Sequence, residues 1–382
     1  MFLALALLGI LIATLWPFSG SPAAQWLGCL ACGARGTADL LLNVILFLPF
    51  GAALARAGQR VGRSSAAAAL LSLIIEVAQL YIPGRDTSLG DVAANTLGGT
   101  LGAILALTAA AWLFPPPGRA RRWSRGAAAC AAGLCGLTGL LLAPAFPASR
   151  YHGLWTPWLA RLERYEGRVL SATLAERPIR PGPLDSPGVR ALLEAEHGFR
   201  LHVRAEAGAP PAGLAPLFAI YDDARREILL LGVDHHDIVV RVRTRAAAVR
   251  LDQPDVRVRD ALLGIDPGDS LDLTVMRTRS AFQVSLNATT ERLGFTVGSG
   301  WSLVLYPEGT PGWLRAALNA LWTGLLFAPA GWWLRTRGDG LVALAAIAAG
   351  LLAAPALTPL IATPAREWAG AVLGLIAGVG LH

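Results

Sequence analysis

The chain contains no lysine and carries little charge of either sign. Only 15% of its 382 residues are charged, and all 33 basic residues are arginine. Hydrophobic residues make up 54% of the sequence, and the mean hydropathy is +0.49. A soluble globular protein of this length needs a more polar surface, so the composition excludes that class and indicates a polytopic membrane protein.

Several motifs for cofactor chemistry are also missing. The sequence has no nucleotide-binding glycine loop and no His-Glu-x-x-His zinc signature, so no cofactor and no metal are predicted. Of the four cysteines, Cys29 and Cys32 form a Cys-x-x-Cys that allows a disulfide in an oxidising compartment. Cys130 and Cys135 lie in an apolar segment and are expected to behave as small apolar residues.

Long apolar runs are what the chain has in abundance. Windows of about 20 residues, the length that crosses a bilayer core, predict about eight transmembrane helices. They cover Phe2–Phe18, Asp39–Ala57, Ser65–Ile82, Asp91–Phe114, Gly126–Ala148, Trp313–Arg335, Leu341–Ala362 and Arg366–Leu381. The first has no basic residue before it and no convincing cleavage site after it, so a retained helix is expected rather than a signal peptide.

The net charge of +7 arises from arginines in short loops between these segments. Such placement is an orientation signal, and it does not indicate nucleic acid. The loops at 56–63, 119–125 and 335–337 fall on one side if every segment crosses, and that side is expected to be cytoplasmic. Both termini are then cytoplasmic, and residues 149–311 lie outside the bacterial inner membrane.

Polar residues interrupt the second to fourth apolar segments, where ionisable groups are costly and mark a site by default. The predicted ligand-binding residues are Asp39, Asn43, Glu76, Gln79, Arg85, Asp86, Asp91 and Asn95. Together with Phe47-Leu48-Pro49-Phe50-Gly51, their order and spacing resemble the VanZ-like family of bacterial membrane proteins over the first third of the chain. The resemblance implies a role in envelope biology, and the family's namesake is tied to glycopeptide-antibiotic resistance.

The predicted topology places all of these polar residues in the outer half of the membrane. A lone carboxyl at Glu76 must be protonated, hydrated or paired, and Arg85 is the obvious partner. Structural alternatives stay open for the others. Ser88-Leu89-Gly90-Asp91 has the form of a capping box in which Asp91 serves the helix end, and Asn43 and Asn95 have the option of hydrogen bonding between helices.

The last apolar segments resemble a degenerate repeat of the first set. Phe327-Ala328-Pro329-Ala330-Gly331 repeats the Phe47–Gly51 run, and Glu367, Ala371, Gly374 and Gly378 have the spacing of Asp91, Asn95, Gly98 and Gly102. Repeated membrane halves often enclose a site at their interface. The copy has no counterpart of Glu76, Gln79 or Asn95, so any chemistry is expected in the first set.

The middle of the chain changes to short runs of alternating apolar and polar residues, which predict an antiparallel all-β sandwich. The expected strands include Phe199–Arg204, Leu217–Tyr221, Glu227–Leu231, Ile238–Arg243, Leu271–Met276, Phe282–Leu286 and a closing Trp301–Tyr306. Over 165–306 their order resembles the laminin-G or concanavalin-A-like jelly roll. The expected domains are therefore 1–148 and 312–382 in the membrane, with the jelly roll inserted at 149–311.

Jelly rolls of this kind include sugar binders and glycan hydrolases. The hydrolases carry Glu-x-Asp-x-Glu on one strand, which is absent here; the nearest pair is Glu194 and Glu196, in a helical or loop segment. Binding is therefore favoured over hydrolysis. Solvated hairpin tips are favoured over calcium or sugar ligation for Asp222, Asp223, Asp234, His235, His236 and Asp237. A solvated strand face, with an anionic polymer as the alternative, is expected for Arg204, Arg241, Arg243 and Arg245.

Two functional hypotheses follow. In the first, the chain is a non-enzymatic membrane protein that binds an envelope glycan or lipid-linked ligand through the outward polar pocket and the lectin-like domain. In the second, it is an enzyme on a lipid-linked phosphate or glycan, with Glu76 as general acid or base, Arg85 as an anion clamp and Asp91 as a further catalytic candidate. A transporter is disfavoured because the polar residues stop in the outer half. The bilayer is the expected partner.

Overall fold

The computed structural model describes residues 1–16, 33–82, 87–159 and 162–380. The chain divides into two compact units. The first comprises Met1–Trp123, Val249–Asp252 and Trp332–Thr336, and the second Ser124–Ala248, Gln253–Gly331 and Arg337–His382.

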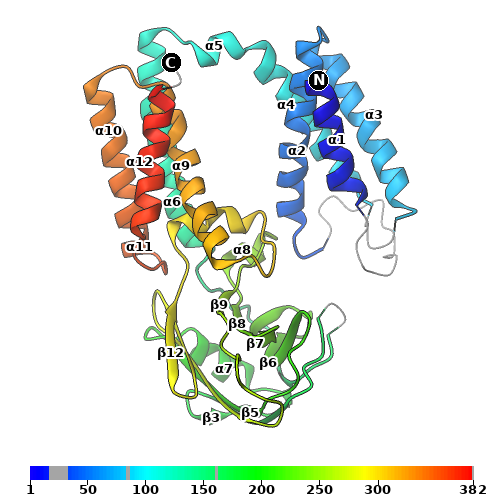
Figure 1. The fold of residues 1–382 in the computed structure, drawn as a ribbon, viewed down its shortest axis with the longest axis vertical. Helices are drawn as coiled ribbons and strands as arrows, with labels where there is room; N and C mark the ends of the chain where they lie inside the picture. Colours follow the sequence, from blue (N-terminus) through cyan, green and yellow to red (C-terminus); the bar gives the residue numbers. More distant parts are fainter. Residues whose placement is uncertain (17–32, 83–86, 160–161, 381–382) are drawn as a thin grey trace. The chain divides into compact units, whose positions relative to one another are not determined.

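The first unit is helical (Figure 1, blue to cyan). Its helices are α1 (Phe2–Leu15), α2 (Gly36–Arg56), α3 (Val61–Gln79), α4 (Leu89–Leu107) and the short α5 (Ala109–Leu113). The N-terminus of α2 is capped by the backbone carbonyl of Arg250, which accepts from the N–H groups of Thr37 (3.1 Å) and Ala38 (3.3 Å). These bonds satisfy donors that a helix start leaves without intrahelical partners.

Glycines bring α2 and α4 into backbone contact. A Cβ atom on Gly51 would overlap the carbonyl oxygen of Gly99, and one on Gly98 would overlap the carbonyl of Val44. Small residues at such crossings let membrane helices pack closely. Gly98 has a small-residue neighbour four positions on, Gly102, whose Cβ would overlap the carbonyl of Leu48, so both glycines serve this close packing.

The helices of the second unit run from α6 to α12. They are α6 (Pro117–Leu141, its first residues in the first unit), α9 (Gly312–Trp332), α10 (Arg337–Ala348), the π-helical η2 (Ala349–Ala353), α11 (Ala354–Leu357) and α12 (Ala365–Gly380). Glycines again mark a close crossing, here of α9 and α12. A Cβ on Gly331 would overlap the carbonyl of Leu375, and one on Gly374 the carbonyl of Gly324.

A helix occurs at each place where a membrane span was predicted, with shifted ends. Among the described residues, four meet the length and composition needed to cross a membrane: α2, α3, α6 and the run Arg337–Leu357. The chain is thus a membrane protein, while the count of about eight spans stays a prediction. The arginines at 119–125 were expected in a loop but lie in the first turns of α6, where Arg125 pairs with Asp339 of α10 at 2.9 Å.

The β-rich part of the second unit consists of two antiparallel six-stranded sheets, in the orders β4-β1-β6-β7-β8-β9 and β12-β11-β10-β5-β2-β3 (Figure 1, green to yellow). The strands are β1 (Tyr151–Trp155), β2 (Arg168–Leu174), β3 (Arg177–Pro178), β4 (Gly182–Pro183), β5 (Phe199–Glu206), β6 (Leu214–Asp222), β7 (Glu227–Asp234), β8 (Asp237–Val242), β9 (Val256–Val258), β10 (Ser270–Arg277), β11 (Phe282–Leu286) and β12 (Thr289–Leu293). Short helices α7 (Ser186–Leu193) and α8 (Arg245–Ala248) join them.

The main apolar core lies between the sheets, and strands such as β5 turn alternate side chains into it. Strands β6 and β7 are buried on both faces, and Leu214, Leu230 and Val239 form a separate, smaller cluster. In β5, Phe199, Leu201 and Val203 are buried, and the residues between them are exposed or half-buried. Leu231 of β7 and Val275 of β10 belong to the same core. The predicted β-sandwich is confirmed, and its assignment as a jelly roll stays a prediction.

The closing strand predicted at Trp301–Tyr306 is wrong. The structure has a 3₁₀ helix there, η1 (Val297–Leu303). Thr296 and Ser299 form a capping box, in which the Thr296 N–H donates to Ser299 Oγ at 3.1 Å. This local bonding favours a helical start over a strand. Strands β1 and β2, which precede the first named run at Phe199, were not among the named strands.

Candidate functional site

The predicted site residues come from three helices of the first unit. Asp39 and Asn43 lie on α2, Glu76 and Gln79 on α3, and Asp91 and Asn95 on α4. Arg85 and Asp86 lie outside the described residues, so the proposed Glu76–Arg85 pair stays a prediction.

Glu76 links the end of α3 to the start of α4. Its side chain is buried, and Oε2 accepts a hydrogen bond from the backbone N–H of Ser88 at 2.8 Å. Ser88 is the N-cap of α4, and its Oγ accepts from the N–H of Gly90 at 3.0 Å. In the predicted capping box, the Asp91 carboxylate reaches back to Ser88. In the structure, the Ser88 N–H donates to Glu76 instead, because α3 ends beside the N-terminus of α4.

Asp91 instead faces α2. Its carboxylate is hydrogen-bonded by the Asn43 side chain, and it lies within electrostatic range of both Asp39 and Glu76. Arg35 is the cation near Asp39. Three helix ends therefore bring three carboxylates together. Within the described ranges, no group of histidine, cysteine or acidic residues has the arrangement of a metal site.

Gln79 and Asn95 each form one hydrogen bond to another helix, and each has a side-chain oxygen without a hydrogen-bond donor. Gln79 Nε2 donates to the carbonyl of Thr14 at 2.9 Å, and Asn95 Nδ2 donates to Ser72 Oγ at 2.8 Å. The inter-helix role considered for Asn95 is thus present. Gln79 Oε1 and Asn95 Oδ1 are buried and have no partner among the described residues. Buried acceptors of this kind are uncommon and call for an explanation such as a missing ligand or water.

The second unit contains a different arrangement at the equivalent helix pair. Glu367, near the start of α12, is fully buried. Its carboxylate accepts from Thr296 Oγ1 (2.5 Å), the Gly298 N–H (2.9 Å) and Asn319 Nδ2 (3.2 Å). Thr323 of α9 donates to its backbone carbonyl at 2.9 Å. This acid is therefore satisfied by neutral donors of its own unit.

A second polar surface lies on the solvent-exposed face of the sheet β12-β11-β10-β5-β2-β3. Two neighbouring clefts of about 380 and 270 Å³ share Arg200, Asp272 and Thr274. His202 lies 3.0 Å from Asp272 through its Nε2 atom. The other lining residues are Thr173, Glu176, Met276, Gln283, Ser285, Asn287 and Thr290. Sequence reasoning missed this surface, although the alternation in β5 and β10 places these residues on one face.

The acidic turn residues do not form one cluster. Asp222 and Asp223 lie at one end of β7, and the turn Asp234–Asp237 lies at the other. The solvated-tip interpretation is wrong for Asp222, Asp234 and Asp237, which are buried. Burial opposes ionisation of Asp222, but hydrogen bonds from Arg226, at 2.7 Å to the guanidinium, outweigh it and lower its pKa.

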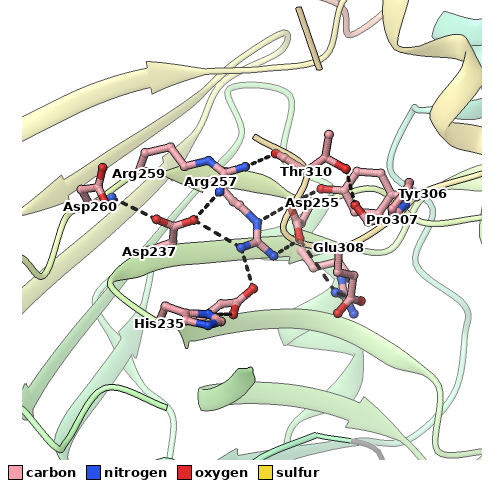
Figure 2. Close-up of polar contacts among 12 residues, drawn as sticks. His235, Asp237, Asp255, Arg257, Arg259, Asp260, Tyr306, Pro307, Glu308 and Thr310 are labelled. Carbon is pink, nitrogen blue, oxygen red and sulfur yellow. Dashed lines mark hydrogen bonds and ion pairs between the residues drawn. The ribbon is translucent and has the colours of Figure 1, made fainter. Parts of the chain in front are cut away.

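The acidic residues of the second turn are buried because they pair with Arg257 (Figure 2). The Arg257 side chain is 2% exposed and contacts Asp234 (2.6 Å), Asp237 (3.3 Å) and Asp255 (3.2 Å). Burial alone would lower the pKa of Arg257, but Asp255 and Asp234 outweigh it and raise the pKa. Tyr306 Oη also donates to Asp255 at 2.5 Å. Sequence reasoning missed this network; the signal was the density of aspartate around the Val-Arg-Val strand.

The predicted solvated arginine face is wrong for Arg241. Its side chain is 12% exposed and pairs with Glu308 (2.8 Å) and Glu227 (3.6 Å). Arg204 and Arg245 are exposed as expected, and Arg243 is half-buried. Burial lowers the pKa of Arg243. The face is therefore divided between structural and exposed arginines.

The comparison with known families concerns the first unit. Residues 4–112 match the VanZ/LLP1 family model. This VanZ-like part spans α1 to α4 and nearly all of α5, and it includes every predicted site residue. The predicted resemblance is confirmed for this part of the chain, and it supports a membrane protein associated with the cell envelope. No curated protein and no solved structure matches the chain.

Proposed function

We propose that this VanZ-like membrane protein binds a hydroxyl-rich envelope glycan, free or lipid-linked, without converting it. The observation that carries the proposal is the open polar face of the sandwich, where two clefts adjoin across β5 and β10. Such a surface offers an extended ligand several subsites rather than one enclosed pocket.

The chemistry of this face suits sugar hydroxyl groups, which both donate and accept hydrogen bonds. Arg200 supplies donors, Asp272 supplies acceptors, and Gln283 supplies both kinds. Asp272 is itself anchored, because its backbone N–H donates to Asn287 Oδ1 at 2.9 Å and its carboxylate contacts His202. An anchored acceptor is pre-organised for a ligand.

The polar cluster of the first unit is proposed to take a donor-bearing headgroup, such as a hydroxyl or an amine of a lipid-linked ligand. Asp39, Asn43 and Asp91 present the carboxylates and amide, and the oxygens of Gln79 and Asn95 are left without partners. An acceptor-rich cluster recognises donors. Arg85 and Asp86 remain predicted members of this site, and the role in glycopeptide-antibiotic resistance remains a prediction.

The enzymatic alternative assigns acid–base work to Glu76. A catalytic carboxyl needs access to a substrate proton, whereas Glu76 Oε2 already accepts from the Ser88 N–H at the α4 cap. This contact favours binding over catalysis. The replacement Glu76→Gln retains an oxygen for Ser88 and is expected to fold, so it separates a lost charge from a lost structure.

The test uses full-length protein in detergent on a glycan array, with mass spectrometry of the glycans before and after incubation. We expect binding without mass change, and at least tenfold weaker binding in Asp272→Asn and Arg200→Gln. Glu196→Gln, an exposed sandwich carboxylate outside both clefts, is the matched control and should bind normally. Cleaved or modified glycan would favour the enzyme; absence of any binding, or equal binding by all variants, would refute the proposal.

A further inference from the structure

A third cleft, of about 250 Å³, lies within the second unit between the sandwich and the starts of α9 and α12. Its wall on the sandwich side comes from β9 and β12, with Asp255, Arg257 and Arg292. Its helical wall comes from Arg315 of α9 and Arg366 of α12. The proposed glycan-binding face involves none of these residues.

Positive charge dominates this cleft. Its lining includes four arginines and a single carboxylate, Asp255. One of the four, Arg257, is already neutralised by Asp234 and Asp237 from outside the cleft, so the excess of positive charge comes from the other three. That carboxylate is already matched by Arg257 at 3.2 Å and by the Tyr306 hydroxyl at 2.5 Å. Arg315 is farther from it, at 3.9 Å. Within the described ranges, no carboxylate pairs with Arg292 or Arg366, so the cleft has cationic groups in excess.

Arg315 is held in position by Tyr306, and its one carboxylate neighbour, Asp255, is a long ion-pair partner at 3.9 Å. Its Nη2 donates to Tyr306 Oη at 3.0 Å, and the guanidinium lies 5.6 Å from the centre of the Tyr306 ring. Its Nε is buried and has no partner among the described residues. An arginine fixed in this way loses little side-chain entropy on binding an anion.

The cleft lies near the end of one candidate membrane span and at the starts of the apolar helices α9 and α12. The candidate span Arg337–Leu357 stops shortly before Ile361 and Pro364, which line the cleft. At the start of α9, Trp313 is 73% exposed. Tryptophan and arginine at the end of apolar helices are typical of the level of the lipid headgroups.

We propose that this cleft binds a phosphate group, carried by an anionic lipid headgroup or by a free phosphate compound. Arginine matches phosphate because its planar guanidinium donates two parallel hydrogen bonds to the oxygens. Basic groups at headgroup level are also attracted to anionic lipids. The inference stands independently of the proposed glycan binding.

The test measures binding to the full-length protein in neutral detergent, with two probes: short-chain phosphatidylglycerol and inorganic phosphate. The double variant Arg292→Gln/Arg366→Gln removes two exposed guanidinium groups that have no structural pairing, so it is expected to fold. We expect at least tenfold weaker binding of phosphatidylglycerol. Arg204→Gln removes one guanidinium charge from an exposed position of β5 outside the cleft, and it should leave binding unchanged.

Two further arms assign the source and the geometry. Binding of phosphatidylglycerol alone identifies a lipid headgroup site, whereas equal binding of inorganic phosphate identifies a site for soluble phosphate compounds. Arg292→Lys/Arg366→Lys keeps the positive charge but cannot donate two parallel hydrogen bonds, so we expect binding between that of the wild type and that of the double glutamine variant. Unchanged binding in the double glutamine variant, or an equal loss in Arg204→Gln, would overturn the proposal.

Discussion

The α2–α4 pair of the first unit and the α9–α12 pair of the second use the same packing. In each, a glycine after a Phe-x-Pro-x sequence meets the partner backbone, and a glycine on the partner meets the first helix. The corresponding contacts are Gly51 with Gly99 and Gly331 with Leu375, and Gly98 with Val44 and Gly374 with Gly324. These contacts are alike at corresponding positions, and the repeat that the sequence spacing suggested stays a prediction.

The polar groups on this shared scaffold differ. Glu367 occupies the place of Asp91 and is satisfied by three donors of its own unit. Asp91 instead lies near Asp39 and Glu76. A buried polar group that is fully paired contributes to structure, whereas an accumulation of like charges costs stability. The difference indicates that Glu367 has a structural role, while the acids of the α2–α4 pair are not matched by donors in the same way.

The largest expected effect tests the shared packing. Gly51→Val and Gly331→Val place side-chain atoms onto a partner backbone that has no room to move, at a cost of about 1–3 kcal/mol or more each. We expect both variants to lose most of their folded yield, measured by size-exclusion chromatography in detergent. Gly133→Ala in α6, whose Cβ would meet nothing within 4 Å, is the control and should fold normally. Normal yield from either valine variant would break the comparison.

The next effect separates the two acids. Glu367→Ala leaves buried donors of Thr296, Gly298 and Asn319 without their acceptor, and each such group costs about 1–3 kcal/mol. Asp91→Ala removes one acceptor from the half-buried Asn43 and also relieves repulsion, so we expect a loss of about 1 kcal/mol or less. Thermal unfolding in detergent measures the difference. Equal destabilisation by the two substitutions would contradict the assignment of Glu367 as the structural copy.

The smallest effect concerns buried acids that are paired with arginine instead of neutral donors. Burial opposes ionisation of Asp234, but hydrogen bonds from His235 and Arg257 outweigh it and lower its pKa. A lowered native pKa adds stability that is complete above the unfolded pKa, near 4, and is lost as pH falls through the native value. We therefore expect Asp234→Asn to be less stable at neutral pH and to lose less stability on acidification. If the free energy of unfolding falls equally with pH in the wild type and in Asp234→Asn, ionisation of Asp234 is not linked to folding.

Much of the helical part was predictable because its signals are local. Apolar windows located the helices, and the small-residue spacing of Gly98 and Gly102 is of the kind that marks a close helix crossing. The spacing of Glu367 from Gly374 also identified it as the counterpart of Asp91. These inferences need only the helical repeat and the size of a side chain.

The remaining features depend on residues distant in sequence. The burial of Arg257 follows from carboxylates on β7, β8 and the segment before β9, which only the sheet order brings together. The contact of Glu76 with Ser88 depends on how α3 meets α4. The 3₁₀ helix at Val297–Leu303 replaced a predicted strand because Thr296 and Ser299 bond to each other and Trp301 donates to Asn319 of α9. Alternation of residue types carries none of this information.

The central claim is that Asp91 of the α2–α4 pair belongs to a ligand site, whereas Glu367 of the α9–α12 pair has a structural role. The most direct measurement purifies Asp91→Asn and Glu367→Gln in parallel and quantifies, by mass spectrometry, the lipids and glycans retained per folded molecule, alongside the melting temperature. We predict that Asp91→Asn keeps the melting temperature and loses retained ligand, while Glu367→Gln lowers the melting temperature and retains it. Retained ligand in Asp91→Asn, together with its loss in Glu367→Gln, would contradict the account.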